Sequence, residues 1–125
     1  MIFTLLQLFL AAAMFDVWLF RYRTPGAFRG GDAKTMEEEF EVYGLPDWFR
    51  KLVRVLKLTA GVLMIAGIWH ELTALVAGIW LAVLMAGAMS MHVKVKDPWY
   101  KAFPSTTFFL MCLLVAWAHR DAWPF

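Results

Sequence analysis

The sequence predicts an all-α fold: an integral membrane four-helix bundle with a short amphipathic cytoplasmic helix between spans one and two. The chain is 62% hydrophobic with a mean hydropathy of +0.60, above the roughly half-apolar composition of soluble domains. Seven Trp and eleven Phe add to this, because aromatic residues collect at membrane interfaces. Its length of 125 residues predicts a single domain over 1–125.

Four apolar segments come close to the roughly 20 residues that cross a bilayer as a helix. The predicted spans lie at about 2–20, 52–69, 73–91 and 105–118. The second carries Arg54 and Lys57 in its first turns, and the fourth is short, with Pro104 just before it. The N-terminus has no basic region and no small-residue cleavage site, so we expect the first span to be retained.

Basic residues are distributed unevenly between the two sides of the membrane that the predicted spans would cross. Eight lie between spans one and two or in the first turns of span two, and three more lie from Lys94 to Lys101. Arg120 is the single exception among the twelve. The positive-inside rule therefore predicts that loops 21–51 and 92–104 are cytoplasmic and both termini are outside, in a bacterial inner (cytoplasmic) membrane.

The first loop is predicted to contain a helix at about 34–43. Asp32 or Thr35 can cap its N-terminus, and Thr35 with Glu38 has the spacing of a capping box. Gly44 is suited to end it. One apolar face is formed by Met36, Phe40 and Tyr43. This helix is expected to lie on the cytoplasmic membrane surface or under the mouth of the bundle.

Small residues recur every four positions along the third span. They are Ala74, Gly78, Ala82, Ala86 and Ser90. Such a stripe lets another helix approach closely. It predicts either a seam between helices of one chain, or a contact with a protein partner or a second copy.

Three ionisable residues approach the cytoplasmic half of the bundle from three different spans: Asp16, Lys57 and His92. One interpretation is structural, with Asp16 paired to Lys57 or to Arg21 or Arg23, and Lys57 reaching toward the head groups. The other is a polar pocket that binds a ligand head group, in which His92 can exchange a proton near neutral pH.

Secondary candidates for this pocket are Arg21, Glu38, Lys94 and Asp97. We predict no metal site, since His70 and His119 belong to the opposite side from His92. The lone Cys112 excludes an internal disulfide, a CxxC pair and a four-cysteine zinc site. No motif indicates nucleic-acid binding.

The stretches "GGDAKTMEEEF", "YGLPDWF", "LKLTAGVLMIAGIW" and "HVKVKDP" together resemble the DoxX-like family of small four-helix membrane proteins. The strongest anchors are 44–46 (Gly-Leu-Pro) and His92 with Asp97-Pro98. Members resemble the small membrane subunit of a thiosulfate:quinone oxidoreductase or partners in other membrane oxidoreductases, and a eukaryotic relative resembles a receptor-assembly chaperone. Members commonly carry a glutamate in span two, whereas this chain has Lys57 in that region.

Three functions follow as hypotheses. The first is a quinone- or lipid-linked redox subunit with no intrinsic cofactor, which binds a quinone or lipid head group between Asp16, Lys57 and His92. The second is a non-catalytic assembly or accessory subunit of a larger membrane complex. The third, a transporter for an organic solute, is weakened because spans three and four hold few polar residues. The sequence leaves open whether the chain is an enzyme.

Overall fold

The computed structural model describes residues 2–22 and 29–122, and these residues form helices and loops without a strand. The long helices are α1 (Ile2–Phe15), α3 (Asp47–Ala66), α4 (Glu71–Lys94) and α5 (Trp99–Ala118). The shorter elements are the π-helical turn η1 (Asp16–Phe20), α2 (Met36–Tyr43) and the 3-10 turn η2 (Arg120–Ala122). The predicted all-α class is therefore confirmed, and each predicted helix has a counterpart.

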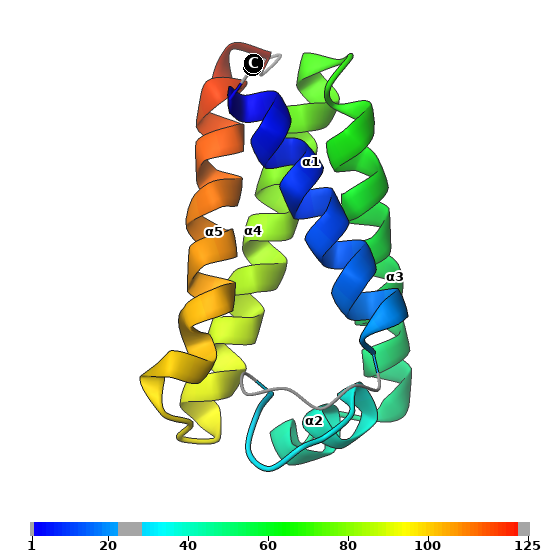
Figure 1. Ribbon diagram of the computed structural model, residues 1–125, viewed down its shortest axis with the longest axis vertical. Helices are drawn as coiled ribbons and strands as arrows, with labels where there is room; N and C mark the ends of the chain where they lie inside the picture. Colours follow the sequence, from blue (N-terminus) through cyan, green and yellow to red (C-terminus); the bar gives the residue numbers. More distant parts are fainter. Residues whose placement is uncertain (1, 23–28, 123–125) are drawn as a thin grey trace.

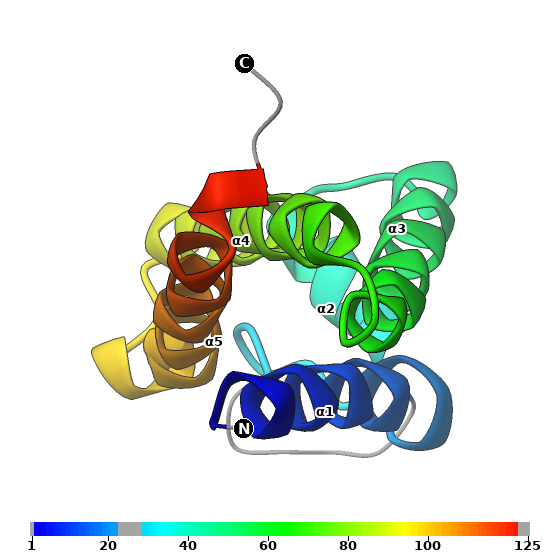
Figure 2. The ribbon, with the colours of Figure 1, turned by 90° about the horizontal axis from the view of Figure 1, so that it is seen from above.

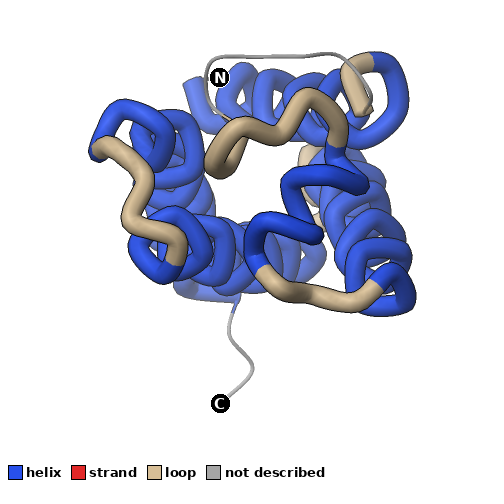
Figure 3. The backbone as a smooth tube through the Cα atoms, turned by 90° about the horizontal axis from the view of Figure 1, so that it is seen from below, coloured by secondary structure: helices blue, strands red, loops and turns tan. Residues whose placement is uncertain are grey.

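The four long helices surround a common interior, as Figure 2 shows from above. Helix α4 packs against α3 and α5, and α1 packs against α3 and α5 from the other side. The short helix α2 lies at the lower end of the molecule in Figure 1. Seen from below, α2 and the loop before it lie across the end of the bundle (Figure 3).

Three helical segments are long and apolar enough to cross a membrane: Ile2–Phe20, Glu71–Lys94 and Trp99–Ala118. The span predicted at 52–69 lies in α3, which does not meet the same measure. The first eleven residues of α3 contain four cations: Arg50, Lys51, Arg54 and Lys57. Length and composition therefore support three membrane-crossing helices.

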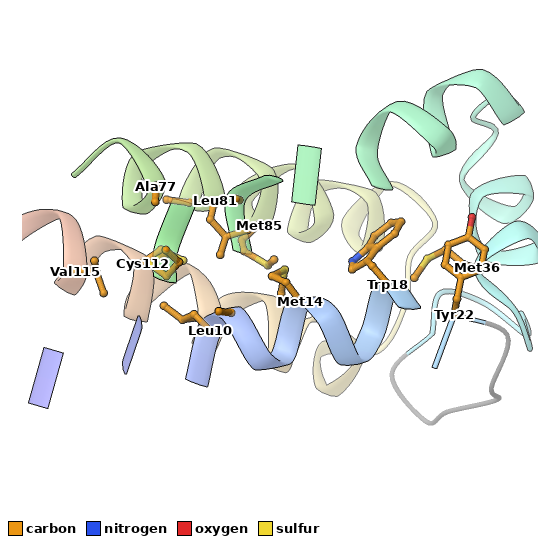
Figure 4. Packing of buried hydrophobic residues seen from close by; sticks show 14 of the residues in the cluster. Leu10, Met14, Trp18, Tyr22, Met36, Ala77, Leu81, Met85, Cys112 and Val115 are labelled. Carbon is orange, nitrogen blue, oxygen red and sulfur yellow. The ribbon is translucent and has the colours of Figure 1, made fainter. Parts of the chain in front are cut away.

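Large apolar side chains point outward on the candidate spans, while several polar side chains are buried. Val83 and Leu110, for example, are 66% and 55% exposed, whereas Gln7 and Lys57 are 2% and 8% exposed. A soluble protein rarely exposes so much apolar surface, and a lipid environment removes the cost. The core between the helices is nevertheless apolar, with Leu10, Met14, Leu81, Met85 and Cys112 lying close together (Figure 4).

Capping explains where α2 begins and ends. Thr35 accepts a hydrogen bond from the backbone N–H of Glu38, at 3.2 Å, which confirms Thr35 as the N-cap. The Glu38 carboxylate accepts from the backbone N–H of Lys34 at 2.8 Å. Gly44 follows in the left-handed conformation with φ 78°, as a helix C-terminus favours.

The start of α5 differs from the prediction. A span starting at 105 was expected to follow Pro104, but the helix begins at Trp99 and continues through Pro104. Pro104 is the sixth residue of α5, just beyond the first four positions, whose N–H groups have no partner within a helix. Its missing N–H therefore removes one bond of the helix, to the carbonyl of Tyr100. The loop predicted at 92–104 is correspondingly short, because α4 extends to Lys94.

The small-residue stripe of α4 divides into two parts. Ala74, Gly78 and Ala82 are buried within the chain. A Cβ on Gly78 would lie 3.0 Å from the backbone of Cys112 and Ala116 in α5. This part of the stripe is the predicted seam between helices of one chain, while Ala86 is half-buried and Ser90 is exposed.

Candidate functional site at the lower end of the bundle

Asp97 is the centre of one buried hydrogen-bond cluster beneath the long helices. Its side chain is only 4% exposed. One carboxylate oxygen lies 2.8 Å from Nδ1 of His92. The other oxygen accepts a hydrogen bond from the backbone N–H of Gly31 at 2.9 Å. It also lies 3.9 Å from Nζ of Lys101. The same Nζ donates a hydrogen bond to the carbonyl oxygen of Gly31. Asp97 thereby fixes the His92 ring and ties the first loop to the turn between α4 and α5.

Glu39 is the centre of a second cluster, on α2. Its carboxylate accepts hydrogen bonds from the Tyr43 hydroxyl at 2.7 Å and from the backbone N–H of Gly30 at 3.1 Å. It also forms an ion pair with Arg29 at 3.0 Å, in which both side chains are nearly buried. Because Gly30 and Gly31 are adjacent, one short loop joins the Glu39 cluster to the Asp97 cluster.

A row of aromatic rings connects the two clusters to η1 and α3. It consists of Trp18, Phe40 and Tyr43, with neighbouring ring centroids 6.1 and 5.9 Å apart. Tyr43 meets the His92 ring edge-on at 5.9 Å. At the other end, Nζ of Lys57 lies 4.7 Å above the centre of the Trp18 ring. Lys57 and His92 therefore lie at the two ends of one aromatic row.

Both of these side chains are buried and retain unused hydrogen-bonding capacity. Among the described residues, Nζ of Lys57 has no hydrogen-bond or ion-pair partner, and neither has Nε2 of His92. Because the Asp97 carboxylate lies beside Nδ1, that nitrogen carries a proton. Nε2 is then an acceptor when the ring is neutral and a donor when the ring is charged.

Asp16 is not part of this arrangement. Its side chain is 45% exposed and pairs with Arg21 at 3.4 Å, across the π-helical turn. This is one of the structural interpretations that the sequence left open. Arg23, the other partner considered for Asp16, lies outside the described residues. Of the three pocket candidates, the structure connects Lys57 and His92 and leaves Asp16 apart.

The secondary candidates have structural roles of different kinds. Lys94 donates from Nζ to the backbone carbonyl of Tyr43 at 2.7 Å, which satisfies an acceptor at the end of α2. Glu38 belongs to the cap of the same helix. Asp97 orients His92 and is the secondary candidate with the most contacts to the site.

Sequence reasoning placed Tyr43 only on the apolar face of the short helix, and it did not single out Glu39 or Trp18 as candidate site residues. A signal for Glu39 was present, because it lies three residues after Met36 and four before Tyr43, on the same helical face. Trp18 carried no such signal, since a tryptophan near a span end is usual at a membrane interface.

The environment of these groups shifts two acid–base equilibria. Burial raises the pKa of Tyr43, and the adjacent Glu39 carboxylate raises it further, so the phenol stays protonated. For Asp97, burial acts to raise the pKa, but the hydrogen bonds from His92 and Gly31 and the charge of Lys101 outweigh it. The net result is a lowered pKa, and Asp97 is an anion at neutral pH.

The matches to known proteins agree with this picture. The model of the DoxX-like family matches residues 5–118. A curated relative is 36% identical over 69 residues and carries the name "Uncharacterized protein YdgD" of Bacillus subtilis (strain 168). That alignment covers 51% of this chain and 60% of the relative. No solved structure matches. With nearly its whole length matched by the family model and its outward apolar surface, this chain is a membrane protein that belongs to the DoxX-like family.

Proposed function

We propose that this chain is a quinone-linked subunit of a membrane redox complex and that it binds the quinone head group beside the aromatic row, with Lys57 and His92 as the polar groups at the two ends of that row. In this proposal all four long helices cross a bacterial cytoplasmic membrane. The cations of α3 then lie at the cytoplasmic interface, where basic residues are favoured. Helix α2 and the turn between α4 and α5 are cytoplasmic, and both termini are outside.

The observation that carries the proposal is the pair of largely buried side chains at the two ends of the aromatic row, each with a polar atom that has no hydrogen-bond partner among the described residues. A hydrogen bond to a charged donor contributes about 1.5–3 kcal/mol, so a ligand that supplies acceptors to these groups is stabilised on binding. A quinone ring offers two carbonyl oxygens and a flat face that can stack on aromatic side chains.

The two end residues have complementary chemistry. The Lys57 ammonium donates a hydrogen bond to one quinone carbonyl. Charged His92 can donate from Nε2 to a quinone carbonyl in the same way, and neutral His92 can accept a proton from the hydroxyl of the reduced quinol. Because three rings separate the two residues, the head group contacts one of them at a time. Asp97 stabilises the charged ring at 2.8 Å. The electrons would come from a partner protein, because the sequence contains no motif that holds a redox cofactor.

The test is mass spectrometry of small molecules retained by the protein in native nanodiscs. We expect a stoichiometric quinone in the wild type and its loss in Lys57→Met and His92→Gln. Lys51→Met is the matched control, since Lys51 is an exposed lysine on the same helix. Asp16→Asn should also retain the quinone, because Asp16 lies apart from the site. Wild-type protein without quinone in quinone-rich membranes would refute the proposal.

A second candidate function is a non-catalytic accessory subunit, and one feature favours it. A groove of about 450 Å³ is lined by Ala86, Met89, Ser90, Val93 and Phe109. It holds the outward part of the small-residue stripe, which suits close approach of a transmembrane helix from a partner subunit. Stoichiometric co-purification of a protein that is lost in Ser90→Trp, together with an empty quinone site, would support this function over the first.

A further inference from the structure

A second groove lies outside the aromatic row, where the end of η1 meets α2 and α3. Its volume is about 480 Å³. Apolar side chains on one side of it are Leu19 and Phe20, which are 46% and 79% exposed. On the other side, Arg50, Lys51 and Arg54 of α3 line it, with Glu37 of α2 as the one acidic lining residue. Neither Lys57 nor His92 contributes to it.

Arg50 shows that this groove is more than a charged surface. Its side chain is 10% exposed, and its Nη1 donates to Asp47 at 3.0 Å. Its Nε is buried and has no hydrogen-bond partner among the described residues, and no described residue bonds its Nη2. The Nε–Nη2 edge of a guanidinium is the fork that binds two oxygens of a phosphate or carboxylate side by side.

Arg54 is held in place at the same groove by two contacts. Its Nε donates to the backbone carbonyl of Trp18 at 3.1 Å, and its guanidinium stacks on the Tyr22 ring at 4.5 Å. No described residue bonds its Nη atoms. A fixed guanidinium loses little freedom when it binds an anion, which favours a specific site over a mobile surface charge.

We propose that this groove binds the phosphate of an anionic phospholipid head group. Arg50 would hold two phosphate oxygens with its Nε–Nη2 edge, and Arg54 and Lys51 would add positive charge. The exposed side chains of Leu19 and Phe20 would contact the acyl chains. The groove places three cations next to apolar side chains at the end of a membrane span. A phospholipid can contact both kinds of group, whereas a free anion can contact only the cations.

The test is lipid retention in native mass spectrometry, with the full-length protein in micelles that contain equal amounts of phosphatidylglycerol and phosphatidylcholine. We expect one phosphatidylglycerol to be retained in preference to phosphatidylcholine. Lys51→Gln and Arg50→Lys should each weaken its retention about tenfold, as expected for one charge-assisted hydrogen bond. Lys34→Gln is the control, because Lys34 is an exposed lysine on the same side of the protein but outside the groove.

Inorganic phosphate added at millimolar concentration separates the two sources of the anion. Weak displacement of phosphatidylglycerol supports a lipid site, whereas complete displacement identifies a site for a free phosphate and overturns the lipid assignment. Equal retention of the two lipids, or retention that Lys51→Gln leaves unchanged, also overturns the proposal. Because Lys51 is exposed, its replacement tests the site even where Arg50→Lys disturbs folding.

Discussion

Near the turn from α3 to α4 the helices are held by close contact between small residues, whereas at the opposite end they are held by buried charges. A Cβ on Gly67 would lie 2.6 Å from Cα of Ala74, and one hydrogen bond, from Gln7 to the Met64 carbonyl at 3.1 Å, crosses the interior there. At the lower end, the clusters around Asp97 and Glu39 join the first loop, α2 and the turn before α5.

This difference separates a rigid end, where helix backbones pack closely, from an end whose polar side chains can still bind a ligand. Close backbone packing removes the space that a ligand or water needs. Buried charges, in contrast, require partners, and groups left without one are available to a ligand. The unpartnered atoms of Lys57, His92 and Arg50 all lie in the half of the molecule that contains the charges.

The largest loss of stability is expected when the carboxylate at the centre of the charged end is removed. Asp97→Ala leaves His92 and Lys101 without their buried carboxylate and should lower the free energy of unfolding by about 3 kcal/mol. The control Asp16→Ala breaks an exposed pair and should cost less than about 1 kcal/mol. Both are measured by denaturant titration in detergent micelles. Equal losses would show that the Asp97 cluster does not hold this end together.

At the tightly packed end, Gly78→Leu should destabilise by about 1–3 kcal/mol, because its side chain would overlap the backbone of α5. Gly87→Leu is the matched control on the same helix, since a Cβ there meets nothing within 4 Å. The two variants are compared by thermal unfolding in the same detergent. Similar melting temperatures would mean that α4 and α5 do not approach as closely as described.

Low pH should destabilise the end of the molecule that contains the Asp97 cluster more than the opposite end. The pKa of Asp97 is lowered in the folded protein, so its carboxylate stabilises the fold fully above its ordinary value of 3.8. That stabilisation is lost as the pH falls below 3.8 through the folded value, at about 1.4 kcal/mol for each unit of lowering. We expect the stability difference between wild type and Asp97→Asn to shrink over this range. A constant difference would contradict the assignment.

The smallest effect concerns the attachment of α2. Lys94→Met removes the hydrogen bond to the Tyr43 carbonyl and should cost about 0.5–1 kcal/mol. The change is expected to be local, with faster amide exchange in α2 and unchanged exchange in α4 and α5. Lys96→Met, in the neighbouring turn, is the control. Uniformly faster exchange in all helices would instead indicate that α2 supports the whole bundle.

Composition, hydropathy and residue spacing were sufficient to predict the helices and to identify the small-residue stripe of α4, for which a seam within the chain was one of two alternatives. These features depend on the local order of residues along one helix, so they can be read without knowing what lies opposite. Thr35 and Gly44 fixed the ends of α2 for the same reason. The exception was α5, where Pro104 suggested a boundary but lies inside the helix.

The candidate site was only half predictable. Lys57 and His92 were singled out because ionisable residues in apolar helices are unusual, and the same argument grouped Asp16 with them. In the structure Asp16 pairs with Arg21 instead. Nothing along the chain distinguishes a carboxylate that faces the interior from one that pairs with the next turn of its own helix.

The sequence by itself determined that the chain is helical, apolar and strongly asymmetric in its basic residues, because these are properties of composition and spacing. Only the tertiary structure decided which polar groups meet. Gly31 reaches Asp97 across 66 positions, and Lys94 reaches Tyr43 across 51. Such contacts exist because α2 and its loop fold beneath the long helices, where burial forces each charged group either to find a partner or to remain available for a ligand.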